Sequence, residues 1–440
     1  MSLQVQHSDI EVALFRPVQL NRASGFLDIA LMVSVCLLLG FGPLAFGGVQ
    51  EWATCVLELG SALLIVLWSA REFARGRFEI VHNYLFFPCV AFAILVAVQI
   101  AGHLSAYGYA SWRNALLWTA YGMILFAVTQ TFRRRIALKW LGLAVTAYGF
   151  LVAVFAIAQQ FIWNGKIFWT VVNSQGGAVY GSYIDHAHYA GLMEMLVPVP
   201  LVFAMASVFS KPVRVLALFA ALIMSSSIFL SQSLGGILAF GVELAVLGAL
   251  SLRRRVSMTE PLVLVALCIL LVIWLIGLHP VGLHERLAKL HNPLHEGGIL
   301  GRLVIVKDSM QMVRQRPVLG WGFGTFPVVY PSFRTFYSDF WINEAHNDYV
   351  QMLVETGLVG FAISLSFLMS LYFLAFGNIY GWRHDLQAST SLAALTGCTG
   401  LLAHGLCDFN LQIPANAALF FAFAAIATRR TLSTRERSGG

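Results

Sequence analysis

The feature that most constrains this chain is a succession of apolar runs, each long enough to cross a lipid bilayer. A spanning helix needs about 20 apolar residues. Only 11% of the 440 residues are charged and 58% are hydrophobic, whereas a soluble domain carries roughly 25% charged residues. The runs lack the alternation of a transmembrane β-barrel strand, and lipid offers no partners to exposed backbone groups. The chain is therefore predicted to be an all-α polytopic membrane protein.

About twelve runs are long enough to be transmembrane helices. The first 25 residues contain charges and Pro17 in place of the short apolar core of a signal peptide, so we expect the first hydrophobic helix to direct insertion and to remain. The predicted spans are 26–46, 52–70, 83–102, 114–131, 137–163, 187–208, 213–231, 234–251, 261–280, 348–376, 388–407 and 412–428.

Basic residues are unevenly shared between the two sides of this arrangement. One side holds 19 of the 28 Lys and Arg residues, counting both terminal segments. The short loops of the opposite side hold only Arg113 and Lys166, and the other seven basic residues lie in one long loop. Because basic residues mark the cytoplasmic side, we expect both termini to be cytoplasmic. Topology thus explains the net charge of +7, and no nucleic-acid partner is expected.

The long loop, residues 281–347, separates an N-terminal bundle (1–280) from the C-terminal helices and tail (348–440). Loops of this length are uncommon unless they are functional. Residues 302–314 are predicted to form an amphipathic helix, which ends before Pro317 and is followed by "GWGFGTF" and an aromatic run to Trp341. The apolar stripe of this helix is predicted to consist of Leu303, Val306, Met310 and Val313.

The strongest local signal is "NEAHNDYVQMLVETGLVG", residues 343–360. His346 and Asn347 lie where the loop enters the tenth span. The free N–H groups and the positive dipole end of that helix would face an anionic ligand such as a lipid phosphate. In the simpler alternative, Asn347 only caps the helix and His346 is an interfacial histidine.

A second polar group opens the sixth span, in "GSYIDHAHYAG". It contains Asp185, His186 and His188 at another helix N-terminus on the side of the long loop. Two histidines beside an aspartate can bind a metal ion, but positions i and i+2 of a helix point to different sides. We therefore expect no metal site here.

A third polar group, "HGLCDFNLQIPANA", forms the short hairpin between the last two spans. His404, Asp408 and Asn410 lie at the edge of the membrane, where polar side chains usually need partners. Either a substrate or helix packing accounts for them. Glu58, Glu194, Glu243 and Glu355 lie within spans, at roughly 3 kcal/mol each on insertion scales, so they are either paired or part of a pathway.

The long loop carries a group of cations, Arg302, Lys307, Arg314 and Arg316. Arginine suits phosphate oxygens because its donors form a planar fork. Arg302 opens the predicted amphipathic helix, where the dipole mildly disfavours a cation. The alternative is an ordinary solvated face.

Several familiar motifs are missing from the sequence. It has no Walker loop, Rossmann glycine fingerprint or Asp-x-Asp pair, so a metal-held nucleotide sugar is not the expected donor. The six cysteines lie in or at the ends of apolar segments, which argues against a disulfide framework and a thiolate metal site. No cofactor is expected.

Together these residues resemble the superfamily of O-antigen ligases, O-antigen polymerases and protein O-oligosaccharyltransferases. The main resemblance runs from Arg302 to Gly360: an arginine-led amphipathic helix, "RPVLGWGFGTF", an aromatic loop and "HNDYVQMLVETGLVG". The stretches "HAHYAGLMEMLVP" and "HGLCDFNLQIPAN" resemble relatives linked to exopolysaccharide synthesis.

The resemblance implies a GT-C-like glycosyltransferase of the bacterial inner membrane with a periplasmic active site. Such enzymes transfer glycan from a polyprenyl-diphosphate carrier (undecaprenyl diphosphate) by a metal-independent, inverting reaction. Acceptors are a growing polysaccharide, the lipid A-core of lipopolysaccharide, or a protein, and other polysaccharide-assembly proteins are possible partners. The family's key histidine corresponds to His346, as the catalytic base or acceptor-positioning group, and its loop arginine to Arg302, as a diphosphate contact. The expected substrate-binding residues are Arg302, Arg314, Arg316, His186, His188, Glu344, Asn347 and Asp408.

The sequence departs from the family pattern at two places. Leu234 stands where many relatives have an arginine in "S-x-S-R-G-G", and Asp185-His186-Ala187 stands where relatives have "N-R-N". We expect His186, His188 and Arg316 to compensate for the two missing cations. The competing hypotheses are a transporter or flippase of lipid-linked sugars and a non-catalytic scaffold of a polysaccharide-assembly complex.

Overall fold

The computed structural model describes residues 22–76, 78–172, 179–252, 299–337 and 341–429. This part of the chain is almost entirely helical, with one two-stranded antiparallel ribbon that pairs Lys166 with Val172 and Ile167 with Val171. The elements are α2 (Arg22–Leu44), η1 (Phe46–Gly48), α3 (Glu51–Ala74), α4 (Phe86–Ala101), α5 (Gly108–Thr131), α6 (Arg135–Phe161), β1 (Lys166–Ile167), β2 (Val171–Val172), α7 (His186–Leu196), α8 (Pro198–Met205), α9 (Lys211–Ser231), α10 (Leu234–Leu252), α13 (Ile299–Gln315), α14 (Phe326–Val329), η2 (Tyr330–Ser332), α15 (Asp348–Asn378), α16 (Leu386–His404), η3 (Asn410–Gln412) and α17 (Pro414–Ala427).

Eleven of the twelve predicted spans lie in the described part of the chain, and each coincides with one or two helices. The twelfth, predicted at 261–280, lies outside the described residues. Six of these helical segments are long and apolar enough to cross a membrane by length and composition. The protein is thus an all-α membrane protein, and the number of twelve spans remains a prediction. The sixth predicted span is divided into α7 and α8 at Pro198, which has no N–H to continue the hydrogen-bond ladder.

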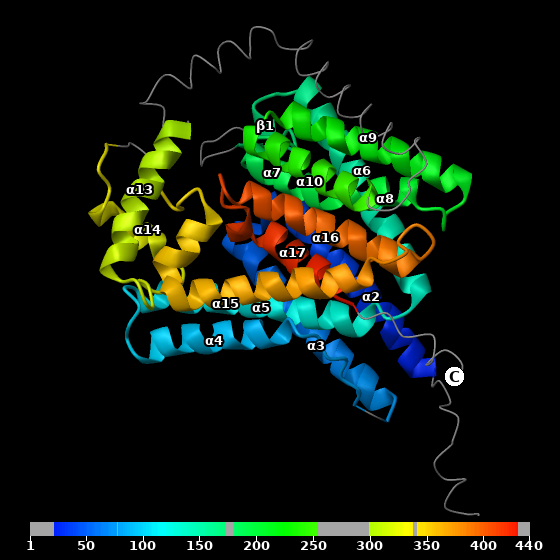
Figure 1. Ribbon diagram of the computed structural model, residues 1–440, viewed down its shortest axis with the longest axis horizontal. Helices are drawn as coiled ribbons and strands as arrows, with labels where there is room; N and C mark the ends of the chain where they lie inside the picture. The colour runs from blue at the N-terminus through cyan, green and yellow to red at the C-terminus, as the bar shows by residue number, and fades with distance from the viewer. Residues whose placement is uncertain (1–21, 77, 173–178, 253–298, 338–340, 430–440) are drawn as a thin grey trace, which may run out of the picture.

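α16 and α17 form the centre of the bundle, between the layer of α15, α5 and α4 and the group of α6–α10 (Figure 1). Both central helices are buried along almost their whole length. α16 is rich in Ala, Ser, Thr and Gly, and small residues let helix backbones approach closely in a membrane. At Gly397 a side chain would meet the Met195 carbonyl of α7 at 2.6 Å.

The peripheral helices expose large apolar side chains, as a lipid-facing surface requires. Examples on α3, α4 and α15 are Leu59, Phe87 and Phe373, which are 67%, 72% and 81% exposed. Leucine and phenylalanine side chains thus face outward while polar side chains lie at the centre, which is the reverse of their placement in a soluble helical bundle.

The basic residues gather at one end of the bundle, called here the basic end. Arg133 pairs with Glu79 at 3.3 Å, and Arg135 pairs with Asp385. These contacts bring together the loops that follow α3, α5 and α15. The sequence asymmetry is therefore a spatial one.

α13 and α14 lie at the opposite end of the bundle, called here the loop end (left in Figure 1). The predicted amphipathic helix is confirmed as α13, and Val313 of its predicted stripe is buried, but the rest of the stripe is not. Leu303 and Met310 are 57% and 37% exposed, whereas Ile305 and Met312 are buried in a small core with Phe326, Tyr330 and Val354. Most of the stripe was misassigned because apolar residues occur on both faces of this helix.

The glycine-rich segment after α13 pairs with a break in α15. The N–H groups of Trp321 and Gly322 donate to the carbonyls of Val354 and Glu355 at 2.9 and 3.0 Å. The Glu355 carboxylate accepts from the N–H groups of Gly324 and Phe326 at 2.8 and 3.3 Å. "GWGFGTF" and "ETGLVG" are thus two halves of one structural joint that fixes the start of α15 at the loop end.

Candidate functional site

The site is built around the N-terminus of α15. The Asn347 side chain caps this helix by accepting from the N–H groups of Tyr349 and Val350, both at 3.0 Å. Its amide nitrogen donates to the Leu406 carbonyl at 2.7 Å. The capping alternative is therefore confirmed for Asn347, whose amide also ties α15 to the turn between α16 and η3.

His346 precedes this cap with a φ of +50°, a left-handed conformation that is uncommon outside glycine and often marks a functional constraint. Its ring is 28% exposed, and its Nδ1 lies 3.7 Å from Oδ1 of Asp408. The ring also packs edge-to-face on Phe409, with centroids 4.9 Å apart. The backbone strain is thus balanced by contacts that hold the imidazole in one orientation.

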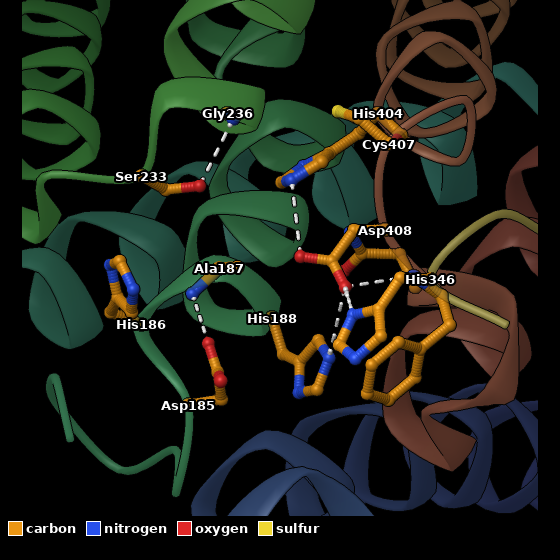
Figure 2. Close-up of polar contacts among 12 residues, drawn as sticks. Asp185, His186, Ala187, His188, Ser233, Gly236, His346, His404, Cys407 and Asp408 are labelled. Atoms are coloured by element: carbon orange, nitrogen blue, oxygen red, sulfur yellow. Dashed lines mark hydrogen bonds and ion pairs between the residues drawn. The ribbon is translucent and has the colours of Figure 1, made fainter. Parts of the chain in front are cut away.

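Asp408 is the centre of a cluster of histidines that come from three segments far apart in sequence (Figure 2). Its carboxylate is 3% exposed and faces three imidazoles, those of His346, His188 and His404, at 3.7, 3.9 and 3.9 Å. Burial alone would raise the pKa of Asp408, but the three imidazoles and the Arg302 guanidinium hold this pKa below its ordinary value. These neighbours therefore favour the ionised form of Asp408.

Arg302 approaches the same carboxylate from α13. One Nη donates to the Cys407 carbonyl, and the other lies 3.7 Å from Oδ2 of Asp408, with the side chain 29% exposed. The structure thus brings Arg302, His188, His346 and Asp408 together.

Glu194 on α7 supports the cluster from inside the bundle. Its carboxylate lies 2.9 Å from Nδ1 of His404, and neither side chain is exposed to solvent. Glu355 also has partners, in the joint described above, whereas both carboxylate oxygens of Glu243 lack a hydrogen-bond partner among the described residues. Helix packing accounts for Asn410, which accepts from the Asn416 amide at 2.9 Å.

The remaining predicted cations make other contacts. Arg316 donates to the Leu104 carbonyl at 2.9 Å and covers the Trp321 ring at 4.3 Å. Arg314 is exposed and reaches only Gln311, at 3.4 Å. Neither forms a hydrogen bond or ion pair with the Asp408 cluster in the described part of the chain.

His186 and His188 point to different neighbours, as their spacing predicts. Nδ1 of His186 lies 2.7 Å from the Ser231 carbonyl, whereas His188 faces Asp408. Asp185 is the cap of α7 and accepts from the Ala187 N–H at 2.7 Å. Across the described ranges, no three His, Cys, Asp or Glu side chains are arranged to hold a metal ion.

A cavity of about 490 Å³ adjoins the cluster, a size typical of small-ligand sites. His188 and Phe409, which contact Asp408 and His346, line one side of it. Glu344 lines another side and accepts from the Gln351 amide; burial and the nearby Glu355 raise the pKa of Glu344 well above its ordinary value. Of the predicted binding residues, His188 and Glu344 thus face a cavity.

Three residues around the site were not among those predicted from the sequence. Phe409 links His188 to His346, Glu194 holds His404, and Arg113 lines the cavity. Glu194 could have been identified from the sequence, because the free-energy cost of a carboxylate within a predicted span is reduced only when that carboxylate has a partner. Arg113 had a signal too, as one of two basic residues in the short loops of its side, whereas Phe409 does not stand out from its neighbours.

Comparison with known proteins finds a family match over part of the chain. Residues 219–365 match the family described as O-antigen ligase, a segment of about a third of the chain that includes Arg302 and His346. No curated protein matches the chain. The match supports the O-antigen ligase and polymerase superfamily and implies a membrane enzyme of glycosyl transfer in O-antigen-related polysaccharide biosynthesis.

Proposed function

We propose, from the O-antigen ligase match over residues 219–365, that this protein transfers glycan from a polyprenyl-diphosphate carrier to an acceptor hydroxyl. The reaction takes place at the loop end, which faces the periplasm of a bacterial inner membrane, with both termini in the cytoplasm. The observation that carries the proposal is the placement of His346, next to Asp408 and before the first turn of α15.

His346 acts as the general base. Its Nδ1 faces the Asp408 anion, which favours a proton on Nδ1 and leaves the Nε2 lone pair for the substrate. The acceptor oxygen attacks the anomeric carbon while its proton passes to Nε2. The bond to the diphosphate oxygen breaks, and the diphosphate leaves with the electron pair. A single displacement of this kind inverts the anomeric centre and requires no metal ion.

The leaving diphosphate needs positive charge more than it needs an acid. Arg302 supplies a partly exposed guanidinium beside Asp408, and the N-terminus of α15 supplies the positive end of its dipole. Arg302 also holds the Cys407–Asp408 backbone, so it positions the carboxylate that orients His346.

The defining experiment uses purified protein in nanodiscs and a lipid-linked oligosaccharide. Longer lipid-linked chains formed from this substrate alone identify a polymerase. Product that forms only with added lipid A-core or protein identifies a ligase or a protein O-oligosaccharyltransferase. Transport across proteoliposomes without any new glycosidic bond contradicts the proposal and favours a flippase.

Replacing His346 by alanine is expected to lower the transfer rate by about 10²–10⁴-fold, the usual contribution of a general base. The matched control is His103→Ala, because His103 is an exposed histidine with a φ of +54° in the loop between α4 and α5. Transfer by His346→Ala at the rate of the unmodified protein would show that His346 is not the base. Gel filtration and thermal unfolding of both variants establish that they are folded.

A further inference from the structure

The cavity beside the Asp408 cluster has a lining suited to a sugar. Amide and hydroxyl groups come from Thr54, Asn114, Asn343 and Gln412, and aromatic faces come from Phe46 and Phe409. Planar polar groups and aromatic rings together match the hydroxyls and the apolar faces of a saccharide. His346 itself does not line the cavity, but its ring contacts Phe409, so a sugar there lies beside the proposed base.

Arg113 distinguishes this cavity from a neutral sugar site. It projects from the second turn of α5 and has no hydrogen-bond or ion-pair partner among the described residues, whereas Arg302 and Arg316 at the same end both donate to backbone carbonyls. Positive-inside topology does not account for a cation at the loop end. An unpaired guanidinium lining a cavity is a ready contact for a carboxylate or phosphate.

The two acidic side chains of the cavity do not neutralise Arg113. Asp185 is used as the cap of α7 and forms no ion pair with Arg113 in the described part of the chain. The carboxyl of Glu344 bonds to Gln351, and burial raises its pKa well above the ordinary value, which favours the neutral form. The positive charge of Arg113 is therefore left for a ligand.

We propose that this cavity is the acceptor subsite and that Arg113 selects an acceptor sugar carrying a carboxylate, such as a uronic acid. The inference rests on the proposed function, because it takes the sugar in the cavity to be the one whose hydroxyl reaches His346. It names a substrate class that the family match leaves open.

The test compares two probes that differ only at one carbon, methyl glucuronoside and methyl glucoside. Their binding to the full-length protein in nanodiscs is measured by saturation-transfer NMR titration. The unmodified protein is expected to bind the glucuronoside about tenfold more tightly, in line with a charge-assisted hydrogen bond. Arg113→Gln removes this preference, and Arg113→Lys, which keeps the charge but loses the fork, retains part of it.

Lys166→Gln is the matched control, because it removes one exposed positive charge from the same end of the molecule, outside the cavity. It is expected to leave the preference unchanged. Equal binding of the two probes by the unmodified protein overturns the inference, and so does a preference that persists in Arg113→Gln.

The same titration on His346→Ala separates this inference from the proposed function. The preference should persist there, since Arg113 and not the imidazole contacts the carboxylate. A glucuronoside preference together with full transfer by His346→Ala would overturn the catalytic role of His346 and leave the subsite standing. Loss of transfer in His346→Ala without any glucuronoside preference in the unmodified protein would overturn the acceptor subsite and leave the catalytic role of His346 standing.

Discussion

At the scale of single residues, the cluster around Asp408 shows how one buried charge organises several weaker groups. Nδ1 of His346, Nε2 of His188 and Nε2 of His404 have no hydrogen-bond partner among the described residues, yet all three face this carboxylate. Burying an anion is costly unless cations or donors surround it. The same neighbours that stabilise Asp408 therefore fix the orientation of His346.

Glu344 provides a pH-dependent prediction at this scale. Burial raises the pKa of Glu344 in the folded protein above an unfolded value of about 4.3. The folded state therefore holds a proton that the unfolded state releases, and stability falls as the pH rises from about 4.3 through the folded pKa. Glu344→Gln, which cannot ionise, is expected to raise the unfolding temperature at pH 8 and to have a smaller effect at pH 5.

This effect is measured by thermal unfolding of the protein in detergent at both pH values. Glu51→Gln is the control, because Glu51 is exposed at the start of α3. Equal stabilisation by Glu344→Gln at pH 5 and pH 8 would contradict the assignment of a raised pKa.

At the scale of elements, the joint between the glycine-rich segment and α15 explains two motifs that sequence patterns alone left open. α15 is broken at Gly357, with φ +62° and ψ −165°, a conformation essentially restricted to glycine. The break frees the carbonyls of Val354 and Glu355, which the N–H groups of Trp321 and Gly322 then satisfy. The motif glycines thus serve the architecture that presents His346, and Glu355 serves the loop instead of a pathway.

Gly357→Ala is expected to destabilise the protein by about 2 kcal/mol or more, from the backbone conformation alone. A Cβ at this position would also meet the Val318 carbonyl oxygen at 2.3 Å. The matched control is Gly377→Ala in the same helix, where a Cβ meets nothing within 4 Å and higher helix propensity is expected to add about 0.5–1 kcal/mol of stability. Thermal unfolding should therefore shift in opposite directions for the two variants; shifts of the same sign would contradict the account of the joint.

At the scale of the whole molecule, the two ends of the bundle differ in charge and in construction. The basic end gathers arginines from loops far apart in sequence, and the loop end carries α13, α14 and the Asp408 cluster. The proposed orientation places the loop end outside the cytoplasm, since basic residues mark the cytoplasmic side.

A matched pair of cysteine substitutions tests this orientation. Tyr337 at the loop end and Tyr380 at the basic end are 81% and 76% exposed. With a membrane-impermeant maleimide on intact spheroplasts, Tyr337→Cys is expected to be labelled above the parent protein. Tyr380→Cys should be labelled only after permeabilisation, and the opposite pattern would reverse the proposed topology.

The sequence by itself determined the helical membrane class, the positions of the helices and the motif around His346. These properties depend on local composition: the length of an apolar run, a capping asparagine and a proline or glycine break. Even there, the buried face of α13 was partly misassigned, because the sequence of that helix offers two apolar faces and only packing against Phe326 and Val354 chooses between them.

Only the tertiary structure decided which polar groups meet. His404 and Glu194 are 210 positions apart, and Arg302 and Cys407 are 105 apart. The first pair forms because α7 and α16 pack closely through small residues and leave room for few polar groups, which must then satisfy one another. Arg113 on α5 has no hydrogen-bond or ion-pair partner in the described part of the chain, and no local pattern in the sequence records its place beside the cavity.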